Sequence, residues 1–596
     1  MFACAASCKE SRKKLVDLTR PNRESGGGID GRLTAMAKLA QQPWLLGIAS
    51  AALLLLPFSI IGPVPFWRTF FAWFAFVPLF YGLLSKQNLR RKRALLYGTL
   101  AAYLMGFLWY VGNCYWIYQT MLYFGGLPPS ISAGILIAYS MVLGLYFAAF
   151  GLLLTATAKA FRSPRYALLA SPFFWVALEL LSSRLTKVPW DLLGYSQIDN
   201  YLLTSLAPFT GVYGLSFVLV AGNALIAWGL LASTPQRRLI VFVGGLLVAL
   251  VLQNGDHFAP PAAPVEATAV LLQQNLNVNE DNRWPGAEYE QHVNQFVKLS
   301  AHTCGPHLAG MPELDAYPVA PDCPTVPVTP GLIIWPESPA PFLDKDSRLL
   351  NALRTVALSM HAPVVAGSTS LDSNGARFDV YNSALFMAPD GVVSDRYDKI
   401  HLVPWGEYIP YKRFFSFAKN LTQAAGDMTH GWRRVVFSSG GHRFGVFICY
   451  EEIFGDEIRQ FVLRGAQLLV NISNDGWYGD TCAPWQTLNM ARMRAVENRR
   501  WLLRDTNTGL TTIIDPYGRL TASVERHART SLAAKYGYRS DLTFYTRHGD
   551  LFAYLCGIIT VGMIAAALRA RLRRPTAASR TLNSKRMAGP AKAHVE

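Results

Sequence analysis

The sequence predicts an α-helical membrane bundle of about eight spans with an inserted α/β domain. Two observations carry this prediction. The chain of 596 residues is 51% hydrophobic with a mean hydropathy of +0.20, which is more apolar than a soluble protein of this size. Its apolar residues gather in separate segments, and one long polar block interrupts the series.

The apolar segments are long enough to cross a membrane, since a helical span needs about 20 residues. We expect spans at 44–62, 68–85, 95–118, 131–158, 167–183, 207–232, 237–253 and 551–570. The predicted units are therefore a membrane domain at 44–253, a polar domain at 254–550 and a last span at 551–571. Basic tails at 1–43 and 572–596 flank them, and we expect the first tail to be disordered.

Basic residues predict the orientation of the bundle. They gather in alternate loops, at 90–93, 159–165, 237–238 and 569–574, whereas the loop at 119–129 has no Lys or Arg. The positive-inside rule places the basic loops and both tails in the cytoplasm. The 254–550 domain then lies on the outer, periplasmic face of a bacterial cytoplasmic membrane. The same rule explains the net charge of +17, so we expect no nucleic-acid partner.

The polar block alternates short apolar runs with amphipathic stretches, which predicts an α/β domain. Periodicity alone does not distinguish one α/β layer arrangement from another. The expected strands are 268–274, 331–335, 363–368, 380–388, 444–448, 467–472 and 510–515. The expected helices are 287–301, 346–360, 454–464 and 485–499.

Cys449 ends one of these buried strands. The next residues, Tyr450, Glu451 and Glu452, are typical of the first turn of a helix. Helix-terminal N–H groups favour a thiolate, the nucleophilic form of cysteine. A buried structural cysteine is the alternative interpretation.

Two more segments place charged residues at strand ends. Glu337 follows the run 331–335, and Lys399 and Glu407 lie eight residues apart in the segment 394–410. Taken singly, each of these residues is as well explained by a solvated surface charge. The order of the three motifs along the chain favours a shared site instead.

The order Glu337, Lys399, Cys449 resembles the nitrilase superfamily, whose catalytic set is Glu, Lys and Cys. The surrounding motifs are similar to one branch of it, the apolipoprotein N-acyltransferase family. They are Trp-Pro-Glu-Ser at 335–338, Lys-Ile-His-Leu-Val-Pro-Trp-Gly-Glu at 399–407, Cys-Tyr-Glu at 449–451, Ser-Asn-Asp-Gly-Trp at 473–477, the stretch 484–495 and Gly-Tyr-Ser-Gln-Ile-Asp at 194–199. The resemblance covers about residues 44–570 and implies a nitrilase-like α-β-β-α sandwich.

The resemblance implies an acyltransferase. Cys449 would attack an ester carbonyl of a phospholipid donor and hold the acyl group as a thioester. Glu337 would act as the general base, and Lys399 would stabilise the oxyanion. Glu407 would pair with the buried lysine. The acceptor would be the α-amino group of the diacylglyceryl-cysteine of an apolipoprotein.

The same resemblance implies supporting and substrate-binding positions and neither a cofactor nor a metal. These positions are Glu407, Tyr450, Glu451, Trp284, Asn382, Asn474 and Trp477. It also implies that the loop residues Trp190, Gly194, Tyr195, Gln197 and Asp199 frame substrate entry. Glu179, in the fifth span, is an intramembrane ionisable residue and so a functional candidate or a helix-pairing group.

Two features of the polar domain have alternative interpretations. Cys304 and Cys323 lie within a Pro-rich insertion at 302–330, which predicts a disulfide in an oxidising compartment rather than a metal site of His302, Cys304 and His307. Aromatic residues at 408–417 predict either a lid that dips into the lipid interface or ordinary core packing.

Two rival functions remain open from the sequence. A membrane-tethered carbon–nitrogen hydrolase (an amidase) would use the same three residues, with water as the acceptor. A non-enzymatic membrane scaffold would need no filled catalytic positions. The match at 194–199, outside the polar domain, favours the acyltransferase over the hydrolase.

Overall fold

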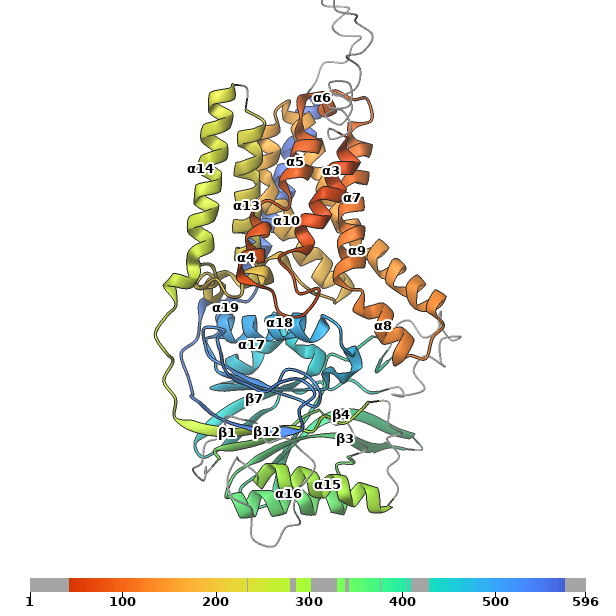
Figure 1. The fold of residues 1–596 in the computed structure, drawn as a ribbon, viewed down its shortest axis with the longest axis vertical. Helices are drawn as coiled ribbons and strands as arrows, with labels where there is room; N and C mark the ends of the chain where they lie inside the picture. Colours follow the sequence, from red (N-terminus) through yellow and green to blue (C-terminus); the bar gives the residue numbers. More distant parts are fainter. Residues whose placement is uncertain are drawn as a thin grey trace, which may run out of the picture.

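The structure, a computed structural model, describes residues 42–232, 234–278, 286–301, 330–337, 342–375, 377–404, 406–408 and 428–573. A helical bundle forms one end of the molecule and a two-sheet sandwich forms the other (Figure 1). Trp284, the predicted Cys304–Cys323 disulfide, most of 408–417 and both tails lie outside the described residues.

Seven helical stretches of the described residues are long and apolar enough to cross a membrane, so the chain is a multi-pass membrane protein. They are Phe66–Leu84 (α4 Phe66–Thr69, η1 Phe70–Trp73 and α5 Val77–Leu84), α7 (Ala94–Asn113), α9 (Pro129–Phe161), α10 (Pro164–Thr186), α13 (Val212–Leu230), Pro235–Phe258 (α14 Pro235–Gln253 and η3 Asn254–Phe258) and α20 (Leu551–Leu572). Short connecting helices are α6 (Lys86–Leu89), α8 (Trp116–Tyr123), η2 (Leu193–Gln197), α11 (Tyr201–Thr204), α12 (Ala207–Thr210) and α19 (Phe544–His548).

The first predicted span, 44–62, is shorter in the structure. It forms α3 (Pro43–Leu55), a helix of 13 residues. At 1.5 Å per residue such a helix covers about 20 Å, less than the roughly 30 Å of a bilayer core. Pro57 follows, and a proline disfavours the helical conformation of the residue before it. The prediction of a full-length span here is therefore wrong.

Twelve strands of the described residues form two six-stranded sheets. The first has the order β12-β1-β2-β3-β4-β5 and the second β11-β10-β9-β8-β7-β6. The bounds are β1 Ala267–Gln273, β2 Leu332–Trp335, β3 Val364–Asn374, β4 Arg377–Met387, β5 Val393–Asp398, β6 Val436–Ser439, β7 His442–Ile448, β8 Leu468–Ser473, β9 Leu502–Thr506, β10 Thr512–Ile514, β11 Leu520–Ser523 and β12 Thr530–Tyr536. In the centre of each sheet three strands run parallel: β1, β2 and β3 in the first, and β7, β8 and β9 in the second.

Helices cover the outer face of each sheet. α15 (Gly286–Ala301) and α16 (Ser347–Met360) pack on the first sheet, and α17 (Gly455–Leu463) and α18 (Ala483–Asn498) pack on the second. This confirms the α-β-β-α sandwich. In Figure 1 α17 and α18 lie between the sheets and the bundle, so the second sheet is the one nearer the membrane helices.

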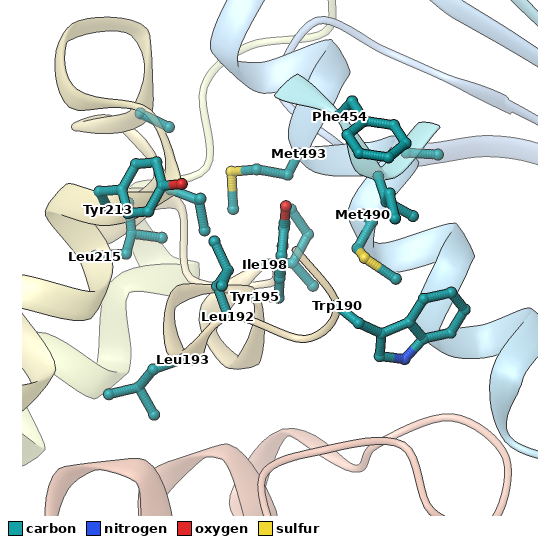
Figure 2. Packing of buried hydrophobic residues seen from close by; sticks show 14 of the residues in the cluster. Trp190, Leu192, Leu193, Tyr195, Ile198, Tyr213, Leu215, Phe454, Met490 and Met493 are labelled. Carbon is teal, nitrogen blue, oxygen red and sulfur yellow. The ribbon is translucent and has the colours of Figure 1, made fainter. Parts of the chain in front are cut away.

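The bundle and the sandwich share one continuous apolar core. Figure 2 shows where the bundle meets the sandwich. Met490 and Met493 of α18, together with Phe454, face Trp190 and Tyr195 of the membrane part. All of these side chains are buried. Burial of this apolar surface holds the layer of α17 and α18 directly against the bundle.

Seven predicted strands and four predicted helices of the polar domain are present within a few residues of their expected bounds, apart from β3, which runs on to Asn374. Five strands escaped prediction: β5, β6, β9, β11 and β12. Their sequences mix polar and apolar residues without a clean alternation, as in Leu-Leu-Arg-Asp-Thr of β9. Each is stabilised by pairing with a neighbouring strand, which the local pattern does not reveal.

Candidate active site

The ends of three strands bring the predicted catalytic residues together. Glu337 lies two residues after β2, Lys399 directly after β5 and Cys449 directly after β7. All three side chains are buried. The charges of Glu337 and Lys399 both act on the Cys449 thiol, the carboxylate raising its pKa and the ammonium lowering it. Residues from both sheets therefore converge on one site.

Lys399 is held between two carboxylates. Its Nζ lies 2.9 Å from Oε1 of Glu407 and 3.3 Å from Oε1 of Glu337, and the side chain is 1% exposed. Burial alone would lower the pKa of Lys399, but Glu407 and Glu337 raise it well above its usual range. The lysine is therefore a fixed positive charge, suited to an oxyanion rather than to proton transfer.

Asn382 of β4 organises the same carboxylates. Its Nδ2 donates to Oε1 of Glu337 at 2.7 Å and to Oε1 of Glu407 at 2.8 Å. The other oxygen of Glu407 accepts the backbone N–H of Val403 at 2.7 Å. Among the described residues, Oε2 of Glu337 has no hydrogen-bond partner, although it is buried. This free oxygen is the atom of the site best placed to accept a proton.

The Cys449 turn differs from the sequence prediction. The residue has a φ of +51°, a conformation that is strained for a non-glycine residue and common at functional sites. A short 3₁₀ helix, η5 (Cys449–Ile453), follows it, and α17 begins only at Gly455. Burial raises the pKa of the thiol well above its usual range, Glu337 raises it further and Lys399 lowers it. The buried surroundings therefore favour the thiol over the thiolate at rest, and acylation then needs a base that removes the thiol proton.

Glu451 ties the nucleophile turn to the lysine segment. Oε1 accepts the backbone N–H groups of Ile400 at 2.8 Å and His401 at 3.0 Å, while Oε2 accepts that of Ile448 at 2.7 Å. The hydroxyl of Tyr397 donates to both oxygens. The carboxylate thus fixes Lys399 relative to Cys449, a role more specific than the pocket shaping that the sequence suggested.

The other supporting residues lie between the nucleophile and the bundle. The Tyr450 hydroxyl donates to the backbone carbonyl of Lys187, at the end of α10, at 3.3 Å. Trp477 lies in η6 (Asp475–Tyr478). Its backbone carbonyl accepts a hydrogen bond from the hydroxyl of Thr120 in α8, and its indole ring packs edge-on against Phe124. Asn474 caps this turn by accepting the N–H of Gly476. None of these three touches the Glu337–Lys399 pair directly through a described hydrogen bond.

The predicted entry loop at 190–199 docks against α18. Trp190 donates from Nε1 to Gln486 at 2.9 Å, Tyr195 accepts from Arg494 at 3.0 Å, and Asp199 pairs with Arg492 at 2.5 Å. Glu179 of α10 accepts the backbone N–H of Leu193 at 2.9 Å. Trp190, Tyr195 and Asp199 therefore fasten the membrane part to α18, whereas the Glu179 bond joins two segments within the membrane part.

Sequence reasoning missed a buried ionic cluster beneath the nucleophile. Arg504 of β9 pairs with Glu452 at 3.1 Å and with Asp475 at 3.0 Å, and all three side chains are fully buried. The available signal was the Arg-Asp pair at 504–505, which directly follows the apolar residues 501–503. Buried charges require partners, so this pair indicated an internal ionic site.

The arrangement supports acyl transfer through a covalent intermediate. It combines a thiol, a carboxylate whose Oε2 has no hydrogen-bond partner within the part of the chain that the structure describes, and a buried ammonium. These are the parts that such chemistry needs. Among the described residues no group of three or more His, Cys, Asp or Glu side chains is suited to hold a metal ion.

Two family models match separate parts of the chain. The family model described as carbon-nitrogen hydrolase matches residues 274–535, and the model described as apolipoprotein N-acyltransferase N-terminal domain matches residues 50–225. Among solved structures, Saccharomyces cerevisiae Nit3 of the nitrilase superfamily matches 46% of this chain and 92% of its own, at 16% identity and a TM-score of 0.32.

Curated relatives match almost the whole chain. The apolipoprotein N-acyltransferase of Geobacter metallireducens is 32% identical over 548 residues, which cover 91% of this chain and 98% of that protein. The apolipoprotein N-acyltransferase of Chlorobaculum tepidum is 27% identical over 578 residues, covering 90% and 99%. On the identity and extent of these matches, the chain belongs to the apolipoprotein N-acyltransferase family.

Proposed function

We propose that the chain transfers an acyl group from a phospholipid to an apolipoprotein through a thioester on Cys449. The sulfur attacks an ester carbonyl of the donor, the thiol proton passes to Oε2 of Glu337, and the leaving alkoxide takes a proton back. Lys399 stabilises the oxyanion of the tetrahedral intermediate. The cluster of Lys399 with Glu337 and Glu407 beside the sulfur is the observation that carries this proposal.

The acceptor step follows the same route in reverse. The α-amino group of a diacylglyceryl-cysteine attacks the thioester carbonyl, the carbon–sulfur bond breaks, and the sulfur recovers a proton as Glu337 accepts one from the amine. The product is an N-acylated lipoprotein. Asn382 and Glu407 hold Glu337 and Lys399 in place through both steps.

The proposed location of the catalytic domain is the outer face of a bacterial cytoplasmic membrane, with both termini in the cytoplasm. Three observations support it. The basic segment around α6 lies at the end of the bundle remote from the sandwich (Figure 1). The layer of α17 and α18 packs on the bundle, and Tyr450 beside the nucleophile contacts the end of α10. Both lipid substrates could then reach the site from the outer leaflet.

Roles for three further residues form part of the proposal. Trp477 and Asn474 line the approach from α8, where a lipid would enter beside Thr120 and Phe124. Trp284, outside the described residues, takes the role of a lid or lipid contact in this proposal, on the family resemblance alone. In this arrangement aromatic groups shield the thioester from water.

The test separates acyl transfer from hydrolysis. The purified protein in detergent is incubated with a fluorescent-acyl phospholipid and a synthetic diacylglyceryl lipopeptide that has a free amino terminus. We expect the label on the amine of the lipopeptide, and no transfer by Cys449→Ala. Release of free fluorescent fatty acid at the same rate with and without the lipopeptide would indicate the hydrolase and contradict the proposal.

A further inference from the structure

A chain of buried polar groups connects the nucleophile to the ionic cluster beneath it. Ser473, the last residue of β8, donates from Oγ to Oδ1 of Asp475 at 3.0 Å. Both oxygens of Asp475 also accept from Arg504, at 3.0 and 3.1 Å. Space for this carboxylate depends on Gly509, where an added Cβ would lie 2.0 Å from Oδ2 of Asp475. The orientation of the serine hydroxyl is therefore fixed.

Arg504 is itself fully occupied. Its Nε and Nη2 donate to Glu452 at 3.1 Å each, and Nη1 also donates to the carbonyl of Leu510. Glu452 lies in η5, the turn that begins with Cys449. One guanidinium thus holds the turn that carries the nucleophile and the turn that follows Ser473.

The other side of the Ser473 hydroxyl faces the sulfur. Strands β7 and β8 run parallel with Ile448 opposite Ile472, so the next residues, Cys449 and Ser473, are neighbours. The Ser473 hydroxyl acts on the sulfur as a donor does, because it lowers the pKa of the thiol. At rest its proton points to Asp475 instead, which leaves the serine oxygen able to accept from the thiol.

Loss of the thiol proton changes what this hydroxyl can do. A thiolate accepts hydrogen bonds, and the Ser473 proton can turn from Asp475 towards the sulfur by rotation about one bond. Asp475 then keeps both of its Arg504 bonds, so the rotation leaves no buried carboxylate unpaired. The pairing of Asp475 with Arg504 therefore keeps the free-energy cost of this rotation small.

We propose that Ser473 is a hydrogen-bond switch for the nucleophile, accepting from the Cys449 thiol at rest and donating to the thiolate when the proton has moved to Glu337. Asp475 and Arg504 are positioning residues that return the hydroxyl to its resting orientation. The inference rests on the proposed function, since it assumes that Cys449 is the acylated residue. No proton is gained or lost overall, because the one that leaves the sulfur resides on Glu337.

The charged and titratable groups around the sulfur come from several elements. Glu337 follows β2, Lys399 and Glu407 follow β5, and Tyr478 ends η6. Substitution of Ser473 leaves all four in place. A change in the pKa of the thiol in such a variant is therefore due to the loss of the Ser473 hydroxyl.

The test measures thiol acidity directly, without any lipid. Full-length protein in detergent is alkylated with iodoacetamide at a series of pH values, and mass spectrometry follows the peptide that contains Cys449. We expect Ser473→Ala to raise the pH midpoint of alkylation by about one unit, and to slow the reaction about tenfold below that midpoint, because a hydrogen bond to a charged group is lost. Ser473→Thr, which keeps a hydroxyl, should restore much of the rate.

Matched controls distinguish this role from a general loss of structure. Ser370→Ala removes another buried hydroxyl, one without a hydrogen-bond partner among the described residues, and should leave the alkylation profile unchanged. Thermal unfolding of each variant checks its fold. The proposal also requires slower formation of the acyl adduct by Ser473→Ala.

An unchanged alkylation midpoint in folded Ser473→Ala would overturn the inference, as would a shifted midpoint with unchanged adduct formation. Failure of the proposed function looks different. The parent protein would then form no acyl adduct on Cys449, whatever its alkylation profile.

Discussion

The carboxylate of Glu451 accepts the backbone N–H of Ile400 at 2.8 Å, which joins the residue two positions after the nucleophile to the residue after Lys399. Cys449 follows a central strand of the second sheet and Lys399 follows the edge strand of the first. The distance between sulfur and ammonium therefore depends on how the two sheets pack. Glu451 fixes that distance locally, where the reaction needs it.

Glu451→Gln should lower both activity and stability. The amide keeps one acceptor oxygen, and its NH₂ group would face backbone N–H donors that now lack a partner. We expect the free energy of unfolding to fall by about 2–3 kcal/mol. The rate of acyl-adduct formation should fall as well. The matched control is Glu525→Gln, on an exposed segment, which should change neither quantity.

Lys399→Ala should slow acylation of Cys449 about 10²–10³-fold, because the oxyanion loses its buried positive charge. The measurement is the single-turnover rate of label transfer from a fluorescent-acyl phospholipid to the protein. Lys345→Ala removes a lysine that is 71% exposed and should have no effect. Equal rates for Lys399→Ala and the parent would exclude the lysine from the chemistry.

Arg504→Met should strongly destabilise the catalytic domain. The substitution leaves Glu452 and Asp475 buried without their cation, a change that costs about 3–5 kcal/mol. Chemical denaturation followed by tryptophan fluorescence measures it. The control is Arg539→Met, which removes an ion pair with Asp541 at the surface and should cost under about 1 kcal/mol. Similar losses for the two variants would count against a structural role for the cluster.

Glu452 should make stability depend on pH. Burial raises the pKa of Glu452 to about 7, although Arg504 lowers it, whereas an unfolded glutamate titrates near about 4.3. The folded protein therefore holds a proton that the unfolded chain releases between these values. The contribution of Glu452 to the free energy of unfolding then falls as pH rises from about 4.3 to 7, by on the order of 3 kcal/mol.

The measurement is the difference in melting temperature between the parent protein and Glu452→Gln across this pH range. All other titrating groups are common to both proteins and cancel in the difference. We expect the parent to lose stability relative to the variant as pH rises. Parallel melting curves from pH 4 to pH 8 would refute the assignment.

Sequence patterns predicted the features of this protein that depend on residues close together in the chain. Apolar length predicted the bundle, and apolar runs ending at Glu337 and Cys449 predicted two of the strands that carry the site. The resemblance of short motifs then predicted the sandwich and the partners of Lys399. Glu407 pairs with Lys399 as expected, whereas the hydrogen bonds from Asn382 to Glu337 and Glu407 were not predicted.

The features that the sequence did not predict depend on tertiary contacts. A polar strand such as β9 forms because β8 and β10 pair with it, and Arg504 is tolerated there only because Glu452 and Asp475 come from elsewhere in the chain. The protonation of the nucleophile also depends on tertiary surroundings. A strand-to-helix junction favours the charged sulfur locally, whereas burial of the side chain raises the pKa of the thiol.

The most direct test of the central claim is the mass of the Cys449 peptide after incubation of the full-length protein with a phospholipid of defined acyl chains and no acceptor. We predict an added mass of one acyl group on that peptide, removed by neutral hydroxylamine and absent in Glu337→Gln. Acylation of another cysteine, such as the buried Cys482, or an unmodified Cys449 under turnover conditions, would contradict the account.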